Sequence, residues 1–213
     1  MFRDRLHAAR LLAEKLSGYR EDQEALVLGL PRGGVPMARV IADALAAPLD
    51  VLLVRKLGVP SQPELAFGAI AEGGVRVLDR HIMDECGVTA RQADKAVARE
   101  EQEIVRRAHL YRDVHRAPEV KGRDVIVVDD GLATGSTMMA AVRALRARAP
   151  RRIIVAVPVG SAEACAKVRE AADELVCLSI PPNFEAVGNW YRDFPQLGDE
   201  DVKAALAAPA VGT

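Results

Sequence analysis

The chain has 213 residues, of which 50% are hydrophobic, and its 29 Lys+Arg against 30 Asp+Glu give a formal net charge of −1. This length suits one large domain with a sizeable core and excludes two full domains. The balanced charge disfavours a nucleic-acid partner, which requires an excess of cations against phosphates, and no run approaches the roughly 18–20 apolar residues of a membrane span. The N-terminus is charged and amphipathic, without the apolar core of a secretion signal. The cysteines, Cys86, Cys165 and Cys177, lack the spacing of a metal site and are typical of a reducing compartment, so we expect a cytoplasmic protein.

Strand and helix patterns alternate along the chain. Continuous apolar runs predict strands buried on both faces, and apolar positions three and four apart predict helices. Strands are expected at 25–29, 49–54, 125–128, 153–157 and 175–178, and helices at 3–17, 35–46, 89–114, 138–148 and 161–172. This alternation predicts an α/β fold with a parallel central sheet and helices on both faces.

Three segments depart from this alternation. Residues 57–74 are rich in Gly and Pro and precede an alternating stretch, 75–78, that is typical of a hairpin arm. The helix at 89–114 should begin at Thr89 as N-cap and lie exposed. Its thin apolar stripe consists of Ala93, Val97, Ile104, Val105 and Ala108. The Ala-rich tail after 199 is expected to fray.

A candidate phosphate-binding turn follows the most apolar strand, where residues 129–137 read DDGLATGST. A helix start offers unpaired N–H groups and a positive dipole end, and the hydroxyls add donors, so this turn suits a phosphate. Asp129 and Asp130 cannot hold the same phosphate, because like charges repel; they should face sugar hydroxyls or a metal ion. The nucleotide-binding patterns GxxxxGK[ST] and GxGxxG are absent. The simpler alternative is an ordinary turn with capping residues.

A second loop, GLPRGGVP at 29–36, follows the first strand. Arg32 can bind a phosphate bidentately, and Gly33 and Gly34 allow the backbone to approach a ligand closely. Loops on either side of a topological switch point form the ligand crevice of an open α/β sheet, so this loop and the 129–137 loop should face each other. An ordinary strand-to-helix turn with an exposed Arg is the alternative.

Two further features suggest a binding site. Arg55 and Lys56 follow the 49–54 strand and could neutralise an anionic leaving group, while a mobile loop at 57–74 could exclude water. A solvated pair of cations beside a β-hairpin is the alternative.

Half of the aromatic residues gather late in the chain: Phe184, Trp190, Tyr191 and Phe194. Together with nearby Asn, Arg and Asp they could stack a planar ring and bind its edge, or they could simply plug one end of the sheet.

The DDGLATGST segment resembles the phosphoribosyl-pyrophosphate-binding motif of type I phosphoribosyltransferases, in a form close to that of adenine phosphoribosyltransferases. Over about 20–200 the chain is similar to a group of bacterial phosphoribosyltransferases that share LPRGGVP, LYR, VDDGLATG and a late WYxDF segment. The resemblance implies a type I phosphoribosyltransferase fold in a single domain, 1–213. It also implies a core at about 20–180, a helical insertion at about 80–117 and a small C-terminal hood at about 181–200.

The same resemblance implies residue roles. The 5-phosphate of phosphoribosyl pyrophosphate (PRPP) would be held by Ala133, Thr134, Gly135, Ser136 and Thr137. Asp129 and Asp130 would address the ribose hydroxyls and stabilise positive charge at the anomeric carbon. The pyrophosphate loop, often with a non-proline cis peptide in this family, corresponds to Arg32, Gly33 and Gly34.

The remaining roles concern the acceptor and proton transfer. Arg55 and Lys56 begin the flexible catalytic loop of the family, with Lys56 among the catalytic candidates. Hypoxanthine-type members carry an Asp where this chain has Ala133, so Glu64 or Glu72 would supply the acid/base group. The hood residues Phe184, Trp190 and Tyr191 would bind the acceptor, and Arg112 and Arg116 could reach the site.

The expected reaction is Mg2+-dependent displacement of pyrophosphate from PRPP by a nitrogen nucleophile such as a nucleobase. Mg2+ would arrive with pyrophosphate and keep much of its water, with Asp129 and Asp130 as carboxylates that could contact it through water. The histidines form no ligand set. The expected partners are PRPP or another phosphorylated ribose and a planar nitrogen acceptor, without nucleic acid or membrane, and a homodimer is left open. Two alternatives are a PRPP-binding regulator without catalysis and a sugar-phosphate phosphohydrolase.

Overall fold

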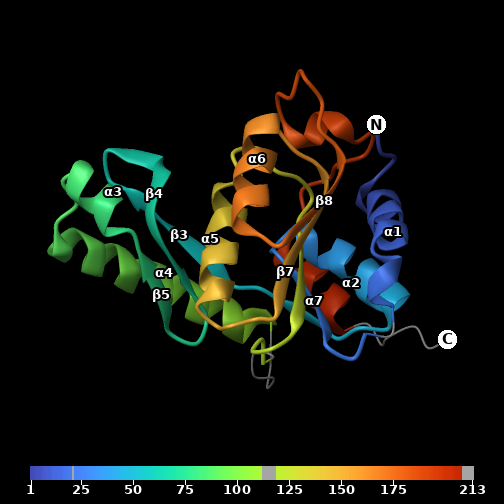
Figure 1. Ribbon diagram of the computed structural model, residues 1–213, viewed down its shortest axis with the longest axis horizontal. Helices are drawn as coiled ribbons and strands as arrows, with labels where there is room; N and C mark the ends of the chain where they lie inside the picture. Colours follow the sequence, from blue (N-terminus) through green and yellow to red (C-terminus); the bar gives the residue numbers. More distant parts are fainter. Residues whose placement is uncertain (21, 112–118, 208–213) are drawn as a thin grey trace.

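The computed structural model describes residues 1–20, 22–111 and 119–207, and Figure 1 shows a larger and a smaller lobe. In these residues the larger lobe contains a parallel sheet with the strand order β2-β1-β6-β7-β8. Its strands are β1 (Ala25–Gly29), β2 (Leu49–Val51), β6 (Asp124–Val128), β7 (Arg152–Val159) and β8 (Glu174–Ser179). The α/β class with a parallel central sheet, expected from the strand and helix patterns, is confirmed.

Helices cover both faces of this sheet. One face packs against α1 (Arg5–Lys15) and α2 (Gly34–Leu45), and the other against α5 (Ser136–Arg146) and α6 (Ala162–Ala171). Successive residues of a strand point to opposite faces, so in β6 Ile126 lies in the core under α1 and α2, while Val125 and Val127 lie in the core under α5 and α6. This is why β1 and β6 are buried throughout and are apolar except for Asp124 at the start of β6.

The smaller lobe contains an antiparallel sheet of β3 (Val54–Val59), β4 (Gln62–Ala71) and β5 (Val75–Leu78) with α3 (Arg80–Glu85) and α4 (Ala90–Tyr111). The predicted strand 49–54 is therefore wrong as a single element: 49–51 joins the large sheet, and the chain from Val54 onward enters the small one. The stretch 57–74, expected as a mobile loop, forms most of the β3–β4 hairpin instead. The hairpin arm at 75–78 is confirmed as β5.

The long helix predicted at 89–114 is confirmed as α4, although one residue of its predicted apolar stripe is exposed. Thr89 caps α4, since its hydroxyl accepts the backbone N–H of Gln92 at 3.3 Å and its own N–H donates to the Gln92 side chain at 2.9 Å. Ala93, Val97 and Ile104 are buried as expected, but Val105 is 54% exposed. At 100° per residue Val105 points away from the stripe that Ile104 continues.

Two short 3-10 helices complete the described part of the larger lobe: η1 (Ser17–Tyr19) follows α1, and η2 (Val187–Trp190) lies in the segment after β8. The segment after 199 is more ordered than expected. The predicted fraying after 199 is wrong for 199–207, which form α7 (Asp199–Ala207) with Val202 buried against the small-lobe core. Arg39 of α2 ties this helix down by donating to the carbonyls of Ala205 and Leu206. Within the described residues no helix is both long and apolar enough to span a bilayer.

Candidate active site

The loops after β1 and β6 lie against each other at the switch point of the large sheet, as predicted. The backbone N–H of Leu30 donates to the carbonyl of Val128 at 2.9 Å. A Cβ on Gly34 would overlap that same carbonyl, and a Cβ on Gly33 would overlap the carboxylate of Asp130. Gly34 is therefore required because two backbone segments approach at the carboxyl ends of their strands, where ligands bind in this class of sheet.

The Pro31–Arg32 peptide bond in the first of these loops is cis. The Arg32 guanidinium, 40% exposed, donates to Asp199 Oδ1 at 3.1 Å and to the Leu197 carbonyl at 3.1 Å. Asp199 also accepts a 2.6 Å hydrogen bond from the Tyr111 hydroxyl. Burial and the Asp199 carboxylate raise the pKa of Tyr111 to about 12, so the phenol remains a donor. The C-terminal helix thus reaches the predicted pyrophosphate loop.

The second loop has the geometry of an anion cradle. Gly135, at a φ of +73°, turns the chain into α5, so the N–H groups of the first helical turn face outward beside the hydroxyls of Thr134 and Ser136. The Thr134 hydroxyl donates to Ser136 Oγ at 3.0 Å and accepts the Ser136 N–H at 3.3 Å. Ser161 Oγ supports the loop by donating to the carbonyl of Ala133 at 2.8 Å. Ala133, Thr134 and Thr137 are exposed, whereas Gly135 is buried.

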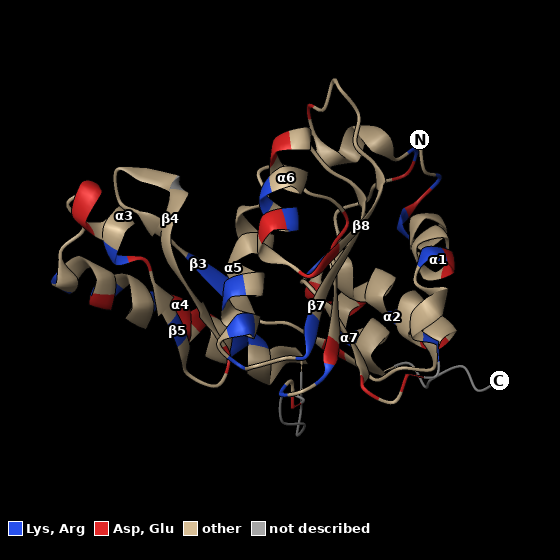
Figure 2. Ribbon diagram, in the orientation of Figure 1, with Lys and Arg blue, Asp and Glu red and all other residues tan. Residues whose placement is uncertain are grey.

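The two cations of β3 reach different surroundings. Lys56 Nζ lies 3.5 Å from Ser136 Oγ and so adds positive charge at the cradle. Arg55 Nε donates to Glu100 of α4 at 2.7 Å. Burial raises the pKa of Glu100, but Arg55 and Arg99 outweigh it and hold the pKa below its usual value. Figure 2 shows these basic residues of β3 beside α5, with acidic residues on α4.

The acidic pair ends β6 beside both loops. Asp129 Oδ1 accepts the N–H of Asp130 at 2.9 Å, and Asp130 Oδ2 forms an ion pair with Arg5 Nε at 2.9 Å. Burial, and next the negative charge of Asp130, raise the pKa of Asp129 well above its usual value. A cation or a hydroxyl donor arriving beside this pair would lower that pKa, because it stabilises the ionised form.

The aromatic cluster packs against the same acids. Tyr191 is buried and its hydroxyl donates to the Asp130 carbonyl at 2.7 Å. Its ring stacks on Phe194 at 4.8 Å between centroids, and the Arg5 guanidinium lies 3.7 Å from the Phe194 centroid. Phe2 adds a tilted contact to Tyr191 at 5.5 Å. These rings have a structural role in joining the N-terminal segment to the segment around Tyr191, and acceptor binding by Tyr191 stays a prediction.

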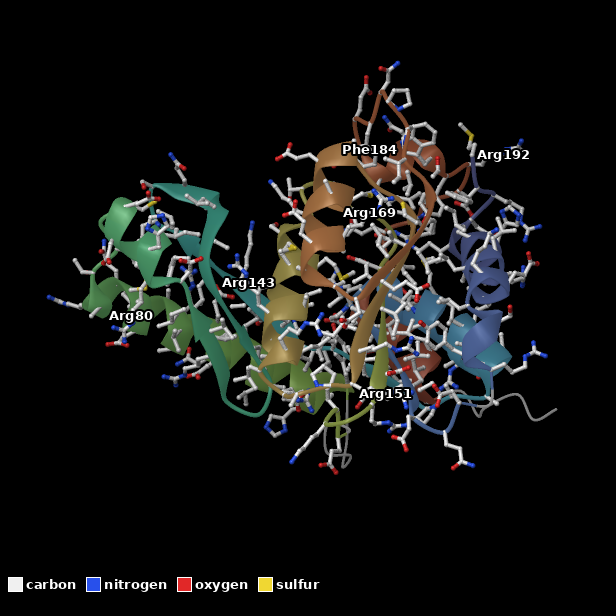
Figure 3. The ribbon with its side chains drawn as sticks, in the orientation of Figure 1. Arg80, Arg143, Arg151, Arg169, Phe184 and Arg192 are labelled. Atoms are coloured by element: carbon white, nitrogen blue, oxygen red, sulfur yellow. The ribbon has the colours of Figure 1, made fainter. Side chains whose placement is uncertain are left out.

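Phe184 and Trp190, the other hood candidates, pack against the same hydrophobic cluster as Tyr191. Phe184 is half-buried and lines a groove of about 1020 Å³ together with Thr134 and Ser136 of the cradle. Arg143 extends from α5 on the side of this groove that faces the small sheet (Figure 3). Trp190 is half-buried, its carbonyl accepts the N–H of Phe2 at 2.7 Å, and its indole nitrogen has no hydrogen-bond partner among the described residues.

Several predicted residues cannot be placed at the site. Arg112 and Arg116 fall outside the described residues, and so does the side chain of Glu64, which lies on β4. Glu72 is half-buried, and its N–H donates to the carbonyl of Leu53 at 3.2 Å. In the described part of the chain no three His, Cys, Asp or Glu side chains gather as a metal-binding group.

Sequence patterns missed some residues of the site. Arg5, Arg107, Ser161 and Asp199 contact or adjoin the predicted residues, yet they lie far from them along the chain. Arg5 and Asp130, for example, are separated by 125 positions. The only local signal was the acidic first turn of α7, Asp199–Asp201, which is typical of a helix N-terminus.

A parallel sheet with a glycine-rich loop, a hydroxyl-rich cradle and an acidic pair at its switch point defines an α/β protein of the phosphoribosyltransferase type. The comparisons agree with this class: the family model described as "Phosphoribosyl transferase domain" matches residues 3–194. The chain belongs to this family.

Relatives and solved structures support the same assignment. Two proteins from strains of Mycobacterium tuberculosis, each named "Putative phosphoribosyl transferase", are 46% identical over 206 residues, which cover 97% of this chain. The chain spans 46% of the length of these relatives. The crystal structure of TT1426 from Thermus thermophilus is 46% identical, with a TM-score of 0.89 over 96% of this chain and 97% of that one. A hypoxanthine-guanine phosphoribosyltransferase from Bacillus anthracis, 13% identical, shares the fold with a TM-score of 0.51 over 89% of this chain and 88% of its own.

Proposed function

We propose that this chain transfers a phosphoribosyl group from PRPP to a nitrogen nucleophile such as a nucleobase, with release of pyrophosphate. One observation carries the proposal: an anion cradle, an acidic pair and a glycine-rich loop with an arginine meet at a single edge of the sheet. PRPP has the matching parts, a 5-phosphate, two ribose hydroxyls and a pyrophosphate.

Each part of the site has a role in this reaction. The N–H groups and hydroxyls of 133–137 bind the 5-phosphate, and Lys56, 3.5 Å from Ser136 Oγ, adds positive charge. Asp129 and Asp130 accept hydrogen bonds from the ribose hydroxyls. Their negative charge stabilises the cation-like ribose as the bond from its anomeric carbon to pyrophosphate breaks. Arg32, Gly33 and Gly34 hold the pyrophosphate.

The acidic pair also fits a magnesium ion that arrives with pyrophosphate. Two adjacent carboxylates, one with a raised pKa, form an oxygen-donor set whose repulsion a cation relieves. Bound Mg2+ would neutralise charge on the departing pyrophosphate. Ala133 offers no acid/base group, so we keep Glu64 and Glu72 as candidates for a proton transfer that only some acceptors need.

A PRPP-binding regulator without catalysis is the second candidate. It is favoured by Ala133 and by the ion pairs that Arg32 and Asp130 already form within the protein. In either case we propose a cytoplasmic location, supported by three cysteines that are free thiols, and a homodimer remains a prediction. We also keep the division into core, insertion and hood as a proposal.

The test measures PRPP binding by calorimetry and pyrophosphate release in the presence of Mg2+ and a panel of purines, pyrimidines and small amines. Asp130→Asn should keep the fold by circular dichroism and lower turnover about 100-fold, because a carboxylate that stabilises the transition state is lost. Asp84→Asn, which removes an exposed carboxylate on α3, is the matched control and should keep full activity. Full activity of Asp130→Asn would refute the site, and PRPP binding without release for any acceptor would support the regulator.

A further inference from the structure

Three arginines from separate parts of the chain line one cavity of about 410 Å³ beside the acidic pair. Arg5 comes from the start of α1, Arg32 from the loop after β1, and Arg107 from α4. Residues 194–197 of the hood also line the cavity and contact Arg5 and Arg32. The volume is within the range of small-ligand sites. The cavity therefore has the size and the position to accommodate the second substrate.

The charged side chains that line this cavity, among the described residues, are all positive. Each guanidinium is held by a carboxylate: Arg5 by Asp130 at 2.9 Å, Arg32 by Asp199 at 3.1 Å and Arg107 by Glu103 at 2.6 Å. None of these three carboxylates lines the cavity, and the described residues that line it include no other acid. The acids thus orient the arginines, and every charged side chain that lines the cavity among the described residues is cationic.

The arginines nearest the interior are also fixed in place. The side chains of Arg5 and Arg107 are 11% and 20% exposed. Arg5 is further held by the Pro195 carbonyl at 2.8 Å and by the face of Phe194. A guanidinium that is already oriented loses little freedom when it binds a planar anion with two hydrogen bonds. This arrangement suits a carboxylate or phosphate group.

The stacking surface of this cavity is already occupied. Arg5 covers the Phe194 ring, and Tyr191 stacks on it as well, so this ring cannot also sandwich a neutral base. Recognition in the cavity must then depend mainly on charge and hydrogen bonding. Because Arg5 also contacts Asp130, an anion bound here lies next to the proposed ribose position.

We infer that the acceptor is an acid, a planar nitrogen compound whose carboxylate or phosphate is bound by Arg5 and Arg107, while Arg32 binds the pyrophosphate. This inference rests on the proposed transfer from PRPP. The acceptor nitrogen forms a bond to the anomeric carbon, and the electron pair of the breaking carbon–oxygen bond leaves with pyrophosphate. The acidic group takes no part in the bond changes and serves to hold and orient the acceptor.

The experiment uses ring pairs that differ in the acidic group: nicotinate and nicotinamide, orotate and uracil, phenyl phosphate and phenol. Calorimetry measures their binding to the full chain, alone and with saturating pyrophosphate, and a separate titration measures PRPP. At least one acidic probe should bind with pyrophosphate present, at least tenfold tighter than its neutral partner. The carboxylate and phosphate pairs show separately which acidic group is preferred.

Arg107→Gln should weaken that binding about ten- to a hundred-fold, as expected when a charge-assisted hydrogen bond is lost, and Arg107→Lys should restore part of it. Arg106→Gln is the matched control. Arg106 pairs with the same Glu103 at 2.8 Å but does not line the cavity, so this variant should bind normally. PRPP affinity should stay within about twofold in all three variants, since the inference places Arg107 at the acceptor.

Four results would overturn the inference: no acidic probe binds, the neutral partners bind equally well, pyrophosphate displaces the acidic probes, or Arg107→Gln binds like the unchanged protein. Displacement by pyrophosphate would assign the cavity to the leaving group instead. Failure of the proposed function looks different, because there the PRPP titration itself shows no binding.

Discussion

Gly34→Ala should destabilise the protein because its new methyl group meets backbone. Gly34 begins α2 where the helix passes the end of β6, and a Cβ there would overlap the Val128 carbonyl and lie 3.0 Å from the Asp129 Cα. The carbonyl cannot rotate away, since it is part of β6 and accepts the N–H of Leu30. The loop, the helix or the strand must therefore shift.

The expected cost follows from two opposing effects. Overpacking costs about 1–3 kcal/mol, and the upper part of this range applies because the obstacle is backbone. Replacing Gly by Ala in a helix returns about 0.5–1 kcal/mol. The free energy of unfolding should thus fall by about 2 kcal/mol. In a chain of this size that corresponds to a Tm lower by about 4–8 °C.

Differential scanning calorimetry of the variant and a control measures this difference. Gly18→Ala is the control, because Gly18 lies in η1 with no other group within 4 Å of its Cβ position. Its Tm should be unchanged or slightly higher, since Ala reduces the entropy of the unfolded chain. Equal Tm values for the two variants would refute the argument that β1, β6 and α2 are packed to backbone contact here.

Two further predictions concern stability. Asp124, buried between Arg151 and Arg152, has a pKa lowered to about 2, chiefly by the hydrogen bond from Arg151. Its contribution is present above the unfolded pKa of about 3.8 and should be lost as the pH falls from about 4 to 2. Over this pH range the free energy of unfolding should fall by about 1–2 kcal/mol through loss of this contribution. Asp124→Asn should be less stable at pH 7 and should lack this part of the acid dependence. Parallel acid profiles of the two proteins would contradict the prediction. Tyr191→Phe keeps the stacked ring but removes the 2.7 Å hydrogen bond to the Asp130 carbonyl. Urea unfolding should show a loss of about 1 kcal/mol at an unchanged m-value, and an unchanged midpoint would mean that this bond contributes nothing.

The local patterns predicted the large sheet well, because its central strands β1, β6 and β7 are buried on both faces and therefore form continuous apolar runs. The split of 49–54 was not predictable in this way. Val51, Leu52, Leu53 and Val54 are all buried, so the apolar run continues while the chain leaves one sheet and enters another. Hydrophobicity reports burial and does not report which strand is the neighbour.

In the candidate site too, some features could be predicted from the sequence and others could not. The meeting of the 29–36 and 129–137 loops could be predicted, because parallel strands at a switch point bring their carboxyl ends together. The partners of the charged residues could not. Asp199 reaches Arg32 only because α7 packs on α2 and α4, although the tail that contains α7 was expected to fray.

The sequence by itself determined the fold class, the family resemblance and the residues that could bind a phosphorylated ribose, since these depend on short segments and their order. Only the tertiary structure decided that Arg5, Arg32 and Arg107 share one cavity and that Tyr191 and Phe194 are packed around Arg5 and Asp130. The physical reason is that these ion pairs, hydrogen bonds and ring contacts form between elements far apart in the sequence, 125 positions for Arg5 and Asp130 and 61 for Tyr191 and Asp130. No local pattern encodes such a contact, because packing of the whole chain creates it.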